Sequence, residues 1–322
     1  MTNAPLLKIE NLRVVYGSRA GQGFVAVNTV NLEIGAGEAF GVVGESGSGK
    51  STIGRAILGL EPHYTGRILF DGRDLAALSA RERRKLTSEI QVVFQDPNGS
   101  LNPARTIGQT LAEPLLVHGK TKAEAVQRIK EVLAQVGLPL EAAQRYPRAF
   151  SGGQRQRIAI ARALTLKPRL IVCDEPVSAL DLSIQAQILN LLAKIRRETG
   201  VAFLFISHDL AVVRHVASRL MVLYRGTVLE AGETETIYAN PQHPYTRRLL
   251  AAMPAPGVAM PALEPEPGGG TLAPNPKGCV YQHRCKDAFA PCATVIPDLR
   301  QSRPGSICAC HLHAPTRQEA LP

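Results

Sequence analysis

A short apolar segment, AFGVVG at 39–44, runs into the glycine-rich turn GESGSGKST at 44–52 and then into the helical pattern STIGRAILGL at 51–60. The turn fits G-x-x-x-x-G-K-[ST], in which glycines let backbone N–H groups converge beside a helix N-terminus. A turn of this kind between a buried strand and a helix surrounds phosphate oxygens. It therefore predicts a β-loop-α unit of a parallel sheet, and with it the α/β fold class.

Individual positions of this turn have separate physical roles. Lys50 is expected to contact the β- and γ-phosphates of a nucleotide, and the Ser51 hydroxyl is expected to ligate Mg²⁺. The predicted nucleotide-binding residues of the turn are Gly44, Glu45, Ser46, Gly47, Ser48, Gly49, Lys50, Ser51 and Thr52.

A second buried strand ends in two neighbouring carboxylates. In RLIVCDEP at 169–176, Asp174 is placed to hold Mg²⁺ directly or through water, and Glu175 is placed to polarise a water for attack on the γ-phosphorus. Adjacent strand residues point in opposite directions, so two successive acids can take two roles. Without the upstream turn, such a pair would more often be a helix cap or surface charge. Cys173 is interpreted as a small core residue.

The remaining periodicity surrounds this core with further strands and helices. Short alternating stretches at 7–34 and 67–72 predict antiparallel strands, and the apolar runs at 169–173 and 201–206 predict core strands followed by helices. Residues 121–137 place their apolar side chains on one face of a helix. The core is therefore expected to alternate β and α.

Composition divides the chain into three parts. We expect one large domain over 1–250 with a helical insert at about 97–165, a Pro- and Gly-rich linker over 251–277, and a Cys-rich extension over 278–322. No apolar run approaches the roughly 18–20 residues that a membrane-spanning helix needs. The N-terminus lacks a basic segment followed by an apolar core, so we expect the protein to stay in the cytosol.

A second glycine-rich turn opens the segment FSGGQRQRIAIARAL at 150–164. Residues 151–153 predict an anion-binding turn at a helix N-terminus, with Arg155 and Arg157 behind it. The segment resembles the signature sequence of ATP-binding cassette (ABC) ATPases. That resemblance implies a P-loop NTPase cassette with a mixed, partly parallel sheet, an antiparallel β subdomain and a helical subdomain, and it implies ATP as the nucleotide.

The same resemblance implies a partner. In this family the signature turn closes over the γ-phosphate held by the P-loop of another subunit in a head-to-tail dimer. The site in one chain is then two half-sites on two faces, and a second ATPase subunit is obligatory. The implied contacts from this turn are Ser151, Gly152, Gly153 and Gln154.

Four further positions match the family residue by residue. Tyr16 resembles the aromatic residue that stacks on adenine, and Gln95 resembles the glutamine that senses Mg²⁺ and couples to the membrane subunits. SALD at 178–181, which ends at Asp181, resembles the loop that crosses the dimer interface, and His208 resembles the switch histidine. Taken singly, a Tyr in a strand is usually packing, and a lone His is usually structural. The implied catalytic residues are Glu175, His208 and Gln95, and the implied Mg²⁺ ligands are Ser51, Gln95 and Asp174.

Two segments look like one branch of the family. FQDPNGSLNPARTIG at 94–108 and NPQHPYTRRLL at 240–250 are similar to the ATPases of oligopeptide, dipeptide and nickel importers. The resemblance implies a peripheral subunit at the cytoplasmic face of the inner membrane. It would work with a related, non-identical ATPase, two membrane permeases and an external binding protein, and would drive peptide import. Nickel chelates or another small solute remain open as cargo.

The extension contains five cysteines, four of them spaced C-x5-C-x6-C-x17-C at Cys279, Cys285, Cys292 and Cys310. This spacing is similar to that in the extension of the same branch, where four cysteines can hold a [4Fe-4S] cluster. From the residues alone, four thiolates suit a cluster or tetrahedral zinc, and free or partly oxidised thiols are the third possibility. Cys308 could substitute for Cys310 as the fourth ligand.

The net charge of +10 motivates a rival interpretation, because a basic excess suits any polyanion. A soluble ABC ATPase acting on DNA or the ribosome would also be basic. Soluble members of those kinds carry either two cassettes in one chain or long coiled-coil or zinc insertions inside the cassette, and this sequence has neither. We therefore expect no nucleic-acid partner.

Overall fold

The computed structural model describes residues 4–17, 23–253 and 277–313 of the 322-residue chain. The central sheet comprises β3 (Ala39–Val43), β6 (Ile90–Val93), β7 (Leu170–Asp174), β8 (Ala202–Ser207), β9 (Arg219–Tyr224), β10 (Thr227–Glu233), β11 (Arg300–Arg303) and β12 (Ser306–Cys308). Its strand order is β11-β12-β10-β9-β3-β8-β7-β6. The strands from β9 to β6 are parallel, and β10, β12 and β11 continue the sheet antiparallel. This mixed sheet confirms the predicted α/β class.

A smaller sheet lies beside the first and is antiparallel throughout. It comprises β1 (Leu7–Tyr16), β2 (Phe24–Ile34), β4 (Tyr64–Phe70) and β5 (Arg73–Asp74), in the order β2-β1-β4-β5. In β1, Leu7 and Ile9 are fully buried while the intervening Lys8 is not, which is the alternation that predicted these strands.

Strand β3 separates two hydrophobic cores. Phe40 and Val42 pack with the antiparallel sheet, whereas Ala39 and Val43 belong to the core on the opposite face, which also contains apolar residues of the helices. A strand buried on both faces has no solvent-exposed side for polar residues, which explains the continuous apolar run at 39–43. The phosphate-binding turn therefore starts from a strand that is buried along its whole length.

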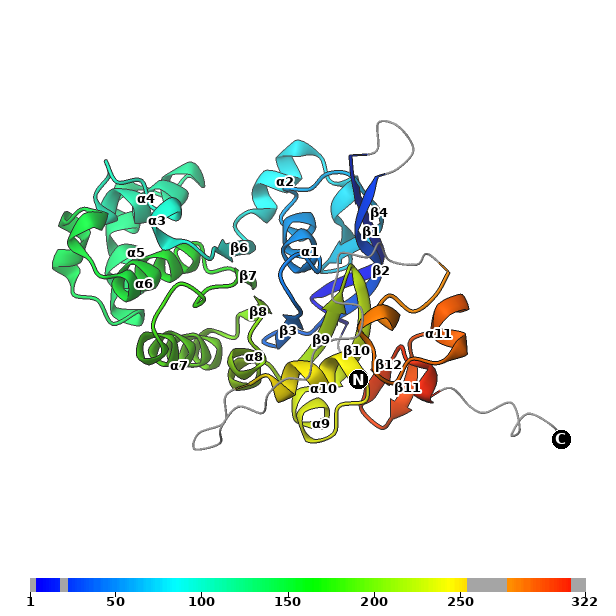
Figure 1. The fold of residues 1–322 in the computed structure, drawn as a ribbon. Coiled ribbons are helices and arrows are strands. Elements are labelled where there is room, and N and C mark those ends of the chain that lie inside the picture. Colours follow the sequence, from blue (N-terminus) through cyan, green and yellow to red (C-terminus); the bar gives the residue numbers. More distant parts are fainter. Residues whose placement is uncertain (1–3, 18–22, 254–276, 314–322) are drawn as a thin grey trace.

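Helices surround this sheet and form a separate lobe. The helices around the sheet are α1 (Lys50–Ile57), α2 (Ala80–Leu86), α7 (Leu182–Thr199), α8 (Leu210–Val216), α9 (Thr234–Ala239) and α10 (Pro244–Ala251). The lobe contains α3 (Pro97–Ser100), α4 (Ile107–Val117), α5 (Lys122–Gln135) and α6 (Gly152–Leu164), and it projects to one side of the strands (Figure 1). No helix among the described residues is both long and apolar enough to span a membrane.

The C-terminal extension shares the central sheet. Besides β11 and β12 it contains a short 3-10 turn, Gln282–Arg284, and α11 (Ala290–Thr294). Glu230 of β10 pairs with Cys308 of β12, so the extension adds two strands beyond β10. In Figure 1 it lies on the opposite side of the molecule from the helical lobe. Most of the predicted linker, residues 254–276, lies outside the described residues.

Candidate active site

The phosphate-binding turn begins directly after β3. Gly44 has φ 157° and Gly49 has φ 101°. A Cβ atom on them would lie 2.1 Å from the Leu223 carbonyl oxygen and 2.2 Å from the Ala26 carbonyl oxygen. Gly49 also precedes α1 without any side-chain cap. The first backbone N–H groups of α1 therefore face an open helix end, which suits an anion.

Lys50 is buried at the start of α1 and reaches back over the turn. Its Nζ donates to the carbonyl oxygens of Gly44 and Glu45 at 2.7 and 2.8 Å. Burial lowers the pKa of the Lys50 ammonium, although nearby carboxylates favour its charge. The hydroxyl of Ser48 is buried and has no hydrogen-bond partner in the described part of the chain. A buried cation and an unpaired hydroxyl in one turn fit the phosphates of a nucleotide.

Ser51 and Asp174 meet across the site. Ser51 Oγ on α1 donates to Asp174 Oδ1 at the end of β7, at 2.8 Å. Burial raises the pKa of the Asp174 carboxyl, and the neighbouring Glu175 adds to this rise, whereas the bond from Ser51 opposes it. Oxygen ligands of this kind fit Mg²⁺, whose charge would offset the cost of the buried carboxylate. Gln95, the third residue predicted for the metal, is exposed just after β6.

Glu175 and His208 stand next to each other at the same edge of the sheet. Glu175 Oε2 accepts from His208 Nδ1 at 3.0 Å, and the two side chains are 16% and 54% exposed. Glu175 has φ 50°, an uncommon left-handed backbone, and its N–H donates to the Ile206 carbonyl of β8 at 2.9 Å. The negative charge of Glu175 raises the pKa of Lys50, opposing the effect of burial. A carboxylate oriented by a histidine beside a phosphate site is suited to accept a proton from water.

The Ser-Gly-Gly-Gln turn caps α6. Ser151 Oγ accepts from the Gln154 N–H at 3.3 Å, and Gln154 Oε1 accepts from the Ser151 N–H at 3.0 Å, which is a complete capping box. Gly153 lies against α7, where an added Cβ would be 2.5 Å from Ile184 Cγ2. This turn belongs to the helical lobe, whereas the phosphate turn lies beside β3 (Figure 1). The two predicted anion-binding turns therefore occupy different parts of the chain.

Two further predicted residues lie near these turns. The hydroxyl of Tyr16, at the end of β1, is 3.5 Å from Thr52 Oγ1 of the phosphate turn. Asp181 caps α7, since its Oδ1 accepts from the Ile184 N–H at 3.0 Å and from the Ser183 hydroxyl. The bond from the Ile184 N–H lowers the pKa of the Asp181 carboxyl. Its structural role here is a helix cap.

Two residues near the site were not predicted. Tyr245 of α10 accepts a hydrogen bond from the Glu45 N–H at 3.0 Å, and Arg284 of the extension pairs with the Glu45 carboxylate at 2.7 Å. They lie 200 and 239 residues from Glu45 along the chain. Tyr245 belongs to the segment 240–250 used above for the family branch, but its spacing carried no sign of this contact.

Comparison with known proteins identifies the family. Residues 27–178 match the family model described as "ABC transporter". A putative peptide import ATP-binding protein of Brucella ovis is 49% identical over 313 residues, covering 96% of this chain and 98% of that protein. The chain belongs to the ATP-binding proteins of ABC transporters. It is therefore an ATPase.

Other relatives of this ABC ATPase support the same family. The oligopeptide transport ATP-binding protein of Escherichia coli is 46% identical over 314 residues, with 92% and 93% of the two chains covered. Residues 229–292 match the model described as "Oligopeptide/dipeptide transporter, C-terminal region". Among solved structures, a dimeric post-hydrolysis ATP-binding cassette bound to ADP and phosphate is 33% identical, with a TM-score of 0.63 and 71% of this chain and 98% of that chain covered.

The cysteines of this ABC ATPase do not form a ready metal site. Among the described residues, no group of three or more His, Cys, Asp or Glu side chains is placed to hold a metal ion. Burial raises the pKa of the Cys279 thiol, to which Cys292 and Cys310 add, and it raises the pKa of Cys285 to about 11. The predicted [4Fe-4S] or zinc centre therefore has no counterpart among the groups of the described residues.

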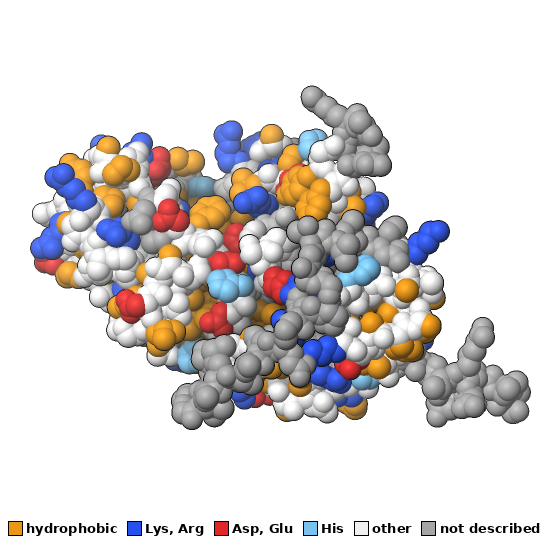
Figure 2. Space-filling model, in the orientation of Figure 1, with side chains coloured by type: hydrophobic (Ala, Val, Ile, Leu, Met, Phe, Trp, Pro, Cys, Tyr) orange, Lys and Arg blue, Asp and Glu red, His pale blue; other side chains and the backbone are white. Residues whose placement is uncertain are grey.

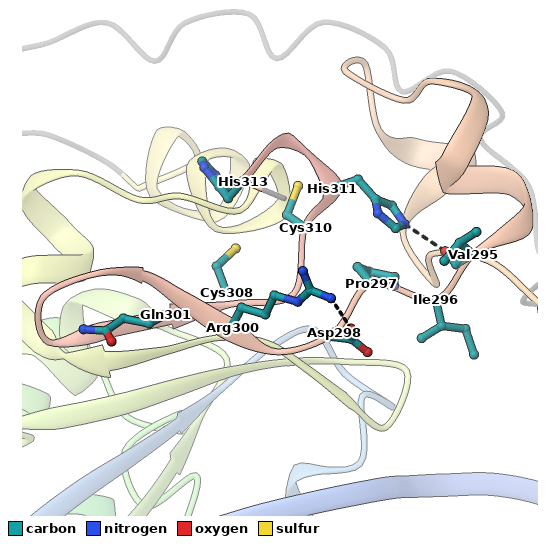
Figure 3. A pocket seen from close by; sticks show the side chains of 10 residues that line it. All are labelled: Val295, Ile296, Pro297, Asp298, Arg300, Gln301, Cys308, Cys310, His311 and His313. Carbon is teal, nitrogen blue, oxygen red and sulfur yellow. Dashed lines mark hydrogen bonds and ion pairs between the residues drawn. The ribbon is translucent and has the colours of Figure 1, made fainter. Parts of the chain in front are cut away.

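The nearby histidines are also engaged elsewhere. A cavity of about 150 Å³ lies beside Cys308 and Cys310 and is lined by His311 and His313 (Figure 3). His311 points away from both sulfurs, with its Nε2 2.8 Å from the Val295 carbonyl oxygen, and His313 Nε2 is 3.1 Å from the Gln242 carbonyl oxygen. Both rings thus serve backbone carbonyls of the extension and its neighbour.

Proposed function

We propose that this ABC ATPase supplies the energy for peptide import at the cytoplasmic face of a bacterial membrane. The single observation that carries the proposal is the pairing of an intact hydrolytic site with a C-terminal region similar to that of oligopeptide and dipeptide transporters. The names of the relatives from Brucella ovis and Escherichia coli support the same cargo class. The chain would work with two membrane permeases and an external binding protein.

The residues of the site divide the chemistry between them. Lys50 and the turn would hold the β- and γ-phosphates of ATP, while Ser51 and Asp174 would hold Mg²⁺, which would neutralise phosphate charge. Glu175, oriented by His208, takes a proton from the attacking water. The oxygen of that water bonds to the γ-phosphorus, the bond to the bridging oxygen breaks, and ADP leaves.

A second ATPase would complete each site, and we propose that it is a related but non-identical chain. The signature turn at Ser151 and the phosphate turn at Gly44 lie in separate parts of this chain, as in Figure 1. A head-to-tail dimer would bring one chain's signature turn to the other chain's phosphate turn. Gln95, which is exposed after β6, would report the state of the site to the permeases.

The experiment is transport by the complete complex. The chain, co-purified with its permeases and partner ATPase, is reconstituted in vesicles with the binding protein, and uptake of labelled di- and oligopeptides is measured with ATP inside. We expect ATP-dependent peptide uptake that Glu175→Gln abolishes. Uptake of a nickel chelate in preference to every peptide would move the chain to the nickel alternative.

The nucleic-acid alternative has weaker support. On the face seen in Figure 2, Lys and Arg side chains of the described residues lie at separate places and form no continuous stripe. Co-purification with nucleic acid in place of permeases would nevertheless favour it.

The metal centre of the extension is not part of this proposal, because no group of the described residues is placed to hold a metal ion. No step is derived through it. Anaerobic purification followed by an absorption spectrum with iron and zinc assays tests the point. Stoichiometric iron or zinc would establish the predicted centre.

A further inference from the structure

A two-pronged ion pair joins the C-terminal extension to the phosphate turn. Arg284 Nη1 lies 2.7 Å from Glu45 Oε2, and Arg284 Nη2 lies 2.9 Å from Glu45 Oε1. The side chains are 22% and 39% exposed. Two parallel bonds between a guanidinium and a carboxylate fix orientation as well as distance. The extension therefore determines where the first side chain after Gly44 points.

Glu45 is also held through its backbone. Its N–H donates to the Tyr245 hydroxyl at 3.0 Å, and its carbonyl oxygen accepts from Lys50 Nζ at 2.8 Å. The residue that receives the Arg284 fork thus also carries one acceptor of the lysine that faces the phosphates. Movement of Glu45 would move both the turn and the position of Lys50.

Arg284 is itself held in place before any nucleotide binds. It ends the short turn Gln282–Arg284, and its N–H donates to the Tyr281 carbonyl at 3.0 Å. Tyr281 packs against Tyr224 and Tyr245, with ring centroids 5.3 and 5.2 Å apart. The Tyr224 hydroxyl accepts from Arg284 Nη1 at 3.3 Å. Aromatic packing against β9 and α10 therefore fixes the guanidinium, so little side-chain entropy is lost in forming the fork.

Charge gives the fork a consequence for binding. The Glu45 carboxylate acts on the ammonium of Lys50, so its field reaches the place where phosphates bind. An unpaired carboxylate there would repel the phosphates of ATP, and Arg284 cancels that charge. We propose that Arg284 is a positioning residue of the nucleotide site, which fixes and neutralises Glu45 and so raises the affinity of the turn for ATP. The inference concerns nucleotide binding and is independent of the transported solute.

The test measures MgATP affinity of the full-length chain and KM and kcat for ATP in the assembled transporter. Because the pair is partly exposed, Arg284→Gln is expected to weaken ATP binding by roughly fivefold. KM should rise by a similar factor with little change in kcat, since Glu175 and His208 pair with each other. Arg284→Lys keeps the positive charge without the two parallel bonds, so its ATP affinity should lie between that of the wild type and that of Arg284→Gln. Arg300→Gln, which breaks only the exposed pair with Asp298 in the same extension, is the matched control and should leave affinity unchanged.

A double-mutant cycle with Glu45→Gln separates this role from simple support of the fold. If Arg284 acts through the Glu45 carboxylate, Arg284→Gln should have little further effect on ATP affinity in the Glu45→Gln background. Equal losses in both backgrounds, or unchanged affinity in Arg284→Gln alone, would overturn the proposal. Melting temperatures of all variants are recorded alongside. If Arg284→Gln does not fold, the decision passes to Arg284→Lys, for which wild-type affinity would equally overturn the role of the fork.

Discussion

Replacing Glu175 with Gln separates ATP binding from hydrolysis. Gln has nearly the same size, and its amide oxygen can still accept the hydrogen bond that His208 Nδ1 now makes at 3.0 Å. The left-handed backbone at this position is held by the bond from its N–H to Ile206, which the substitution keeps. The fold, Lys50 and the Ser51–Asp174 pair are untouched. The variant should therefore bind MgATP with wild-type affinity.

The expected loss follows from what the carboxylate alone supplies. A positioned general base contributes about 10²- to 10⁴-fold in rate, or roughly 3 to 5 kcal/mol of barrier. Phosphate binding and metal ligation remain, so residual hydrolysis should persist within that range. We expect single-turnover phosphate release in the assembled transporter to fall by about two to four orders of magnitude.

The assay pairs phosphate release with equilibrium binding of ATP. Glu198→Gln is the control, because Glu198 lies at the exposed end of α7 and pairs only loosely with Lys194, at 3.8 Å. Wild-type phosphate release from the Glu175→Gln complex would refute the role of Glu175 as the base. Lost ATP binding in the same variant would instead mean that the carboxylate is needed to shape the site.

Three further results are expected. Asp174→Asn should raise the melting temperature of the nucleotide-free chain at neutral pH, because the raised pKa of Asp174 means that its contribution to stability is present in acid and lost as pH rises through the folded-state pKa. The same variant should lose the extra stabilisation by MgATP. An unchanged MgATP shift would count against Asp174 as a ligand. Gly153→Ala should destabilise the chain by about 1–2 kcal/mol in chemical denaturation, since its Cβ would crowd Ile184 and overpacking outweighs the helix propensity of Ala. Gly152→Ala, whose Cβ would find its nearest neighbour at 3.6 Å, is the control and should be neutral. His243→Asn should make unfolding less sensitive to acid: burial lowers the pKa of His243 from 6.5 to about 3, so the wild-type chain loses stability as pH falls across that window, whereas Asn keeps an acceptor for the Tyr245 N–H and binds no proton. Denaturation midpoints measured from pH 7 to pH 4 decide this, and parallel curves for both proteins would contradict it.

Short sequence patterns predicted the segments whose structure depends on neighbouring residues. The turn at Gly44, the strand before it and the strand ending at Asp174 follow from glycine geometry and from burial on both faces, which leave direct marks in sequence. The capped helix 122–135 was predicted from one apolar face within 121–137. These segments, with the family resemblance, were sufficient for the fold class and for the choice of ATP.

Contacts between distant segments left no such mark. The Arg284–Glu45 pair joins residues 239 positions apart, and neither residue lies in a periodic pattern that would have linked them. Strand β12 has only three residues, too few for alternation to reveal that it extends the central sheet. The cysteine spacing described a possible ligand set, but spacing contains no information on the burial that raises the pKa of the Cys279 and Cys285 thiols.

The addition of β12 and β11 beyond β10 also decides how this chain can be shortened. Without the extension, the backbone N–H and C=O groups of β10 that now face Ser306 to Cys308 would form an exposed row without hydrogen-bond partners. Such a row is a template for strands of other chains. A fragment ending near residue 250 would therefore keep the phosphate turn and yet be prone to self-association. For this ATPase, the segment that follows the cassette is therefore also the strand partner that β10 needs.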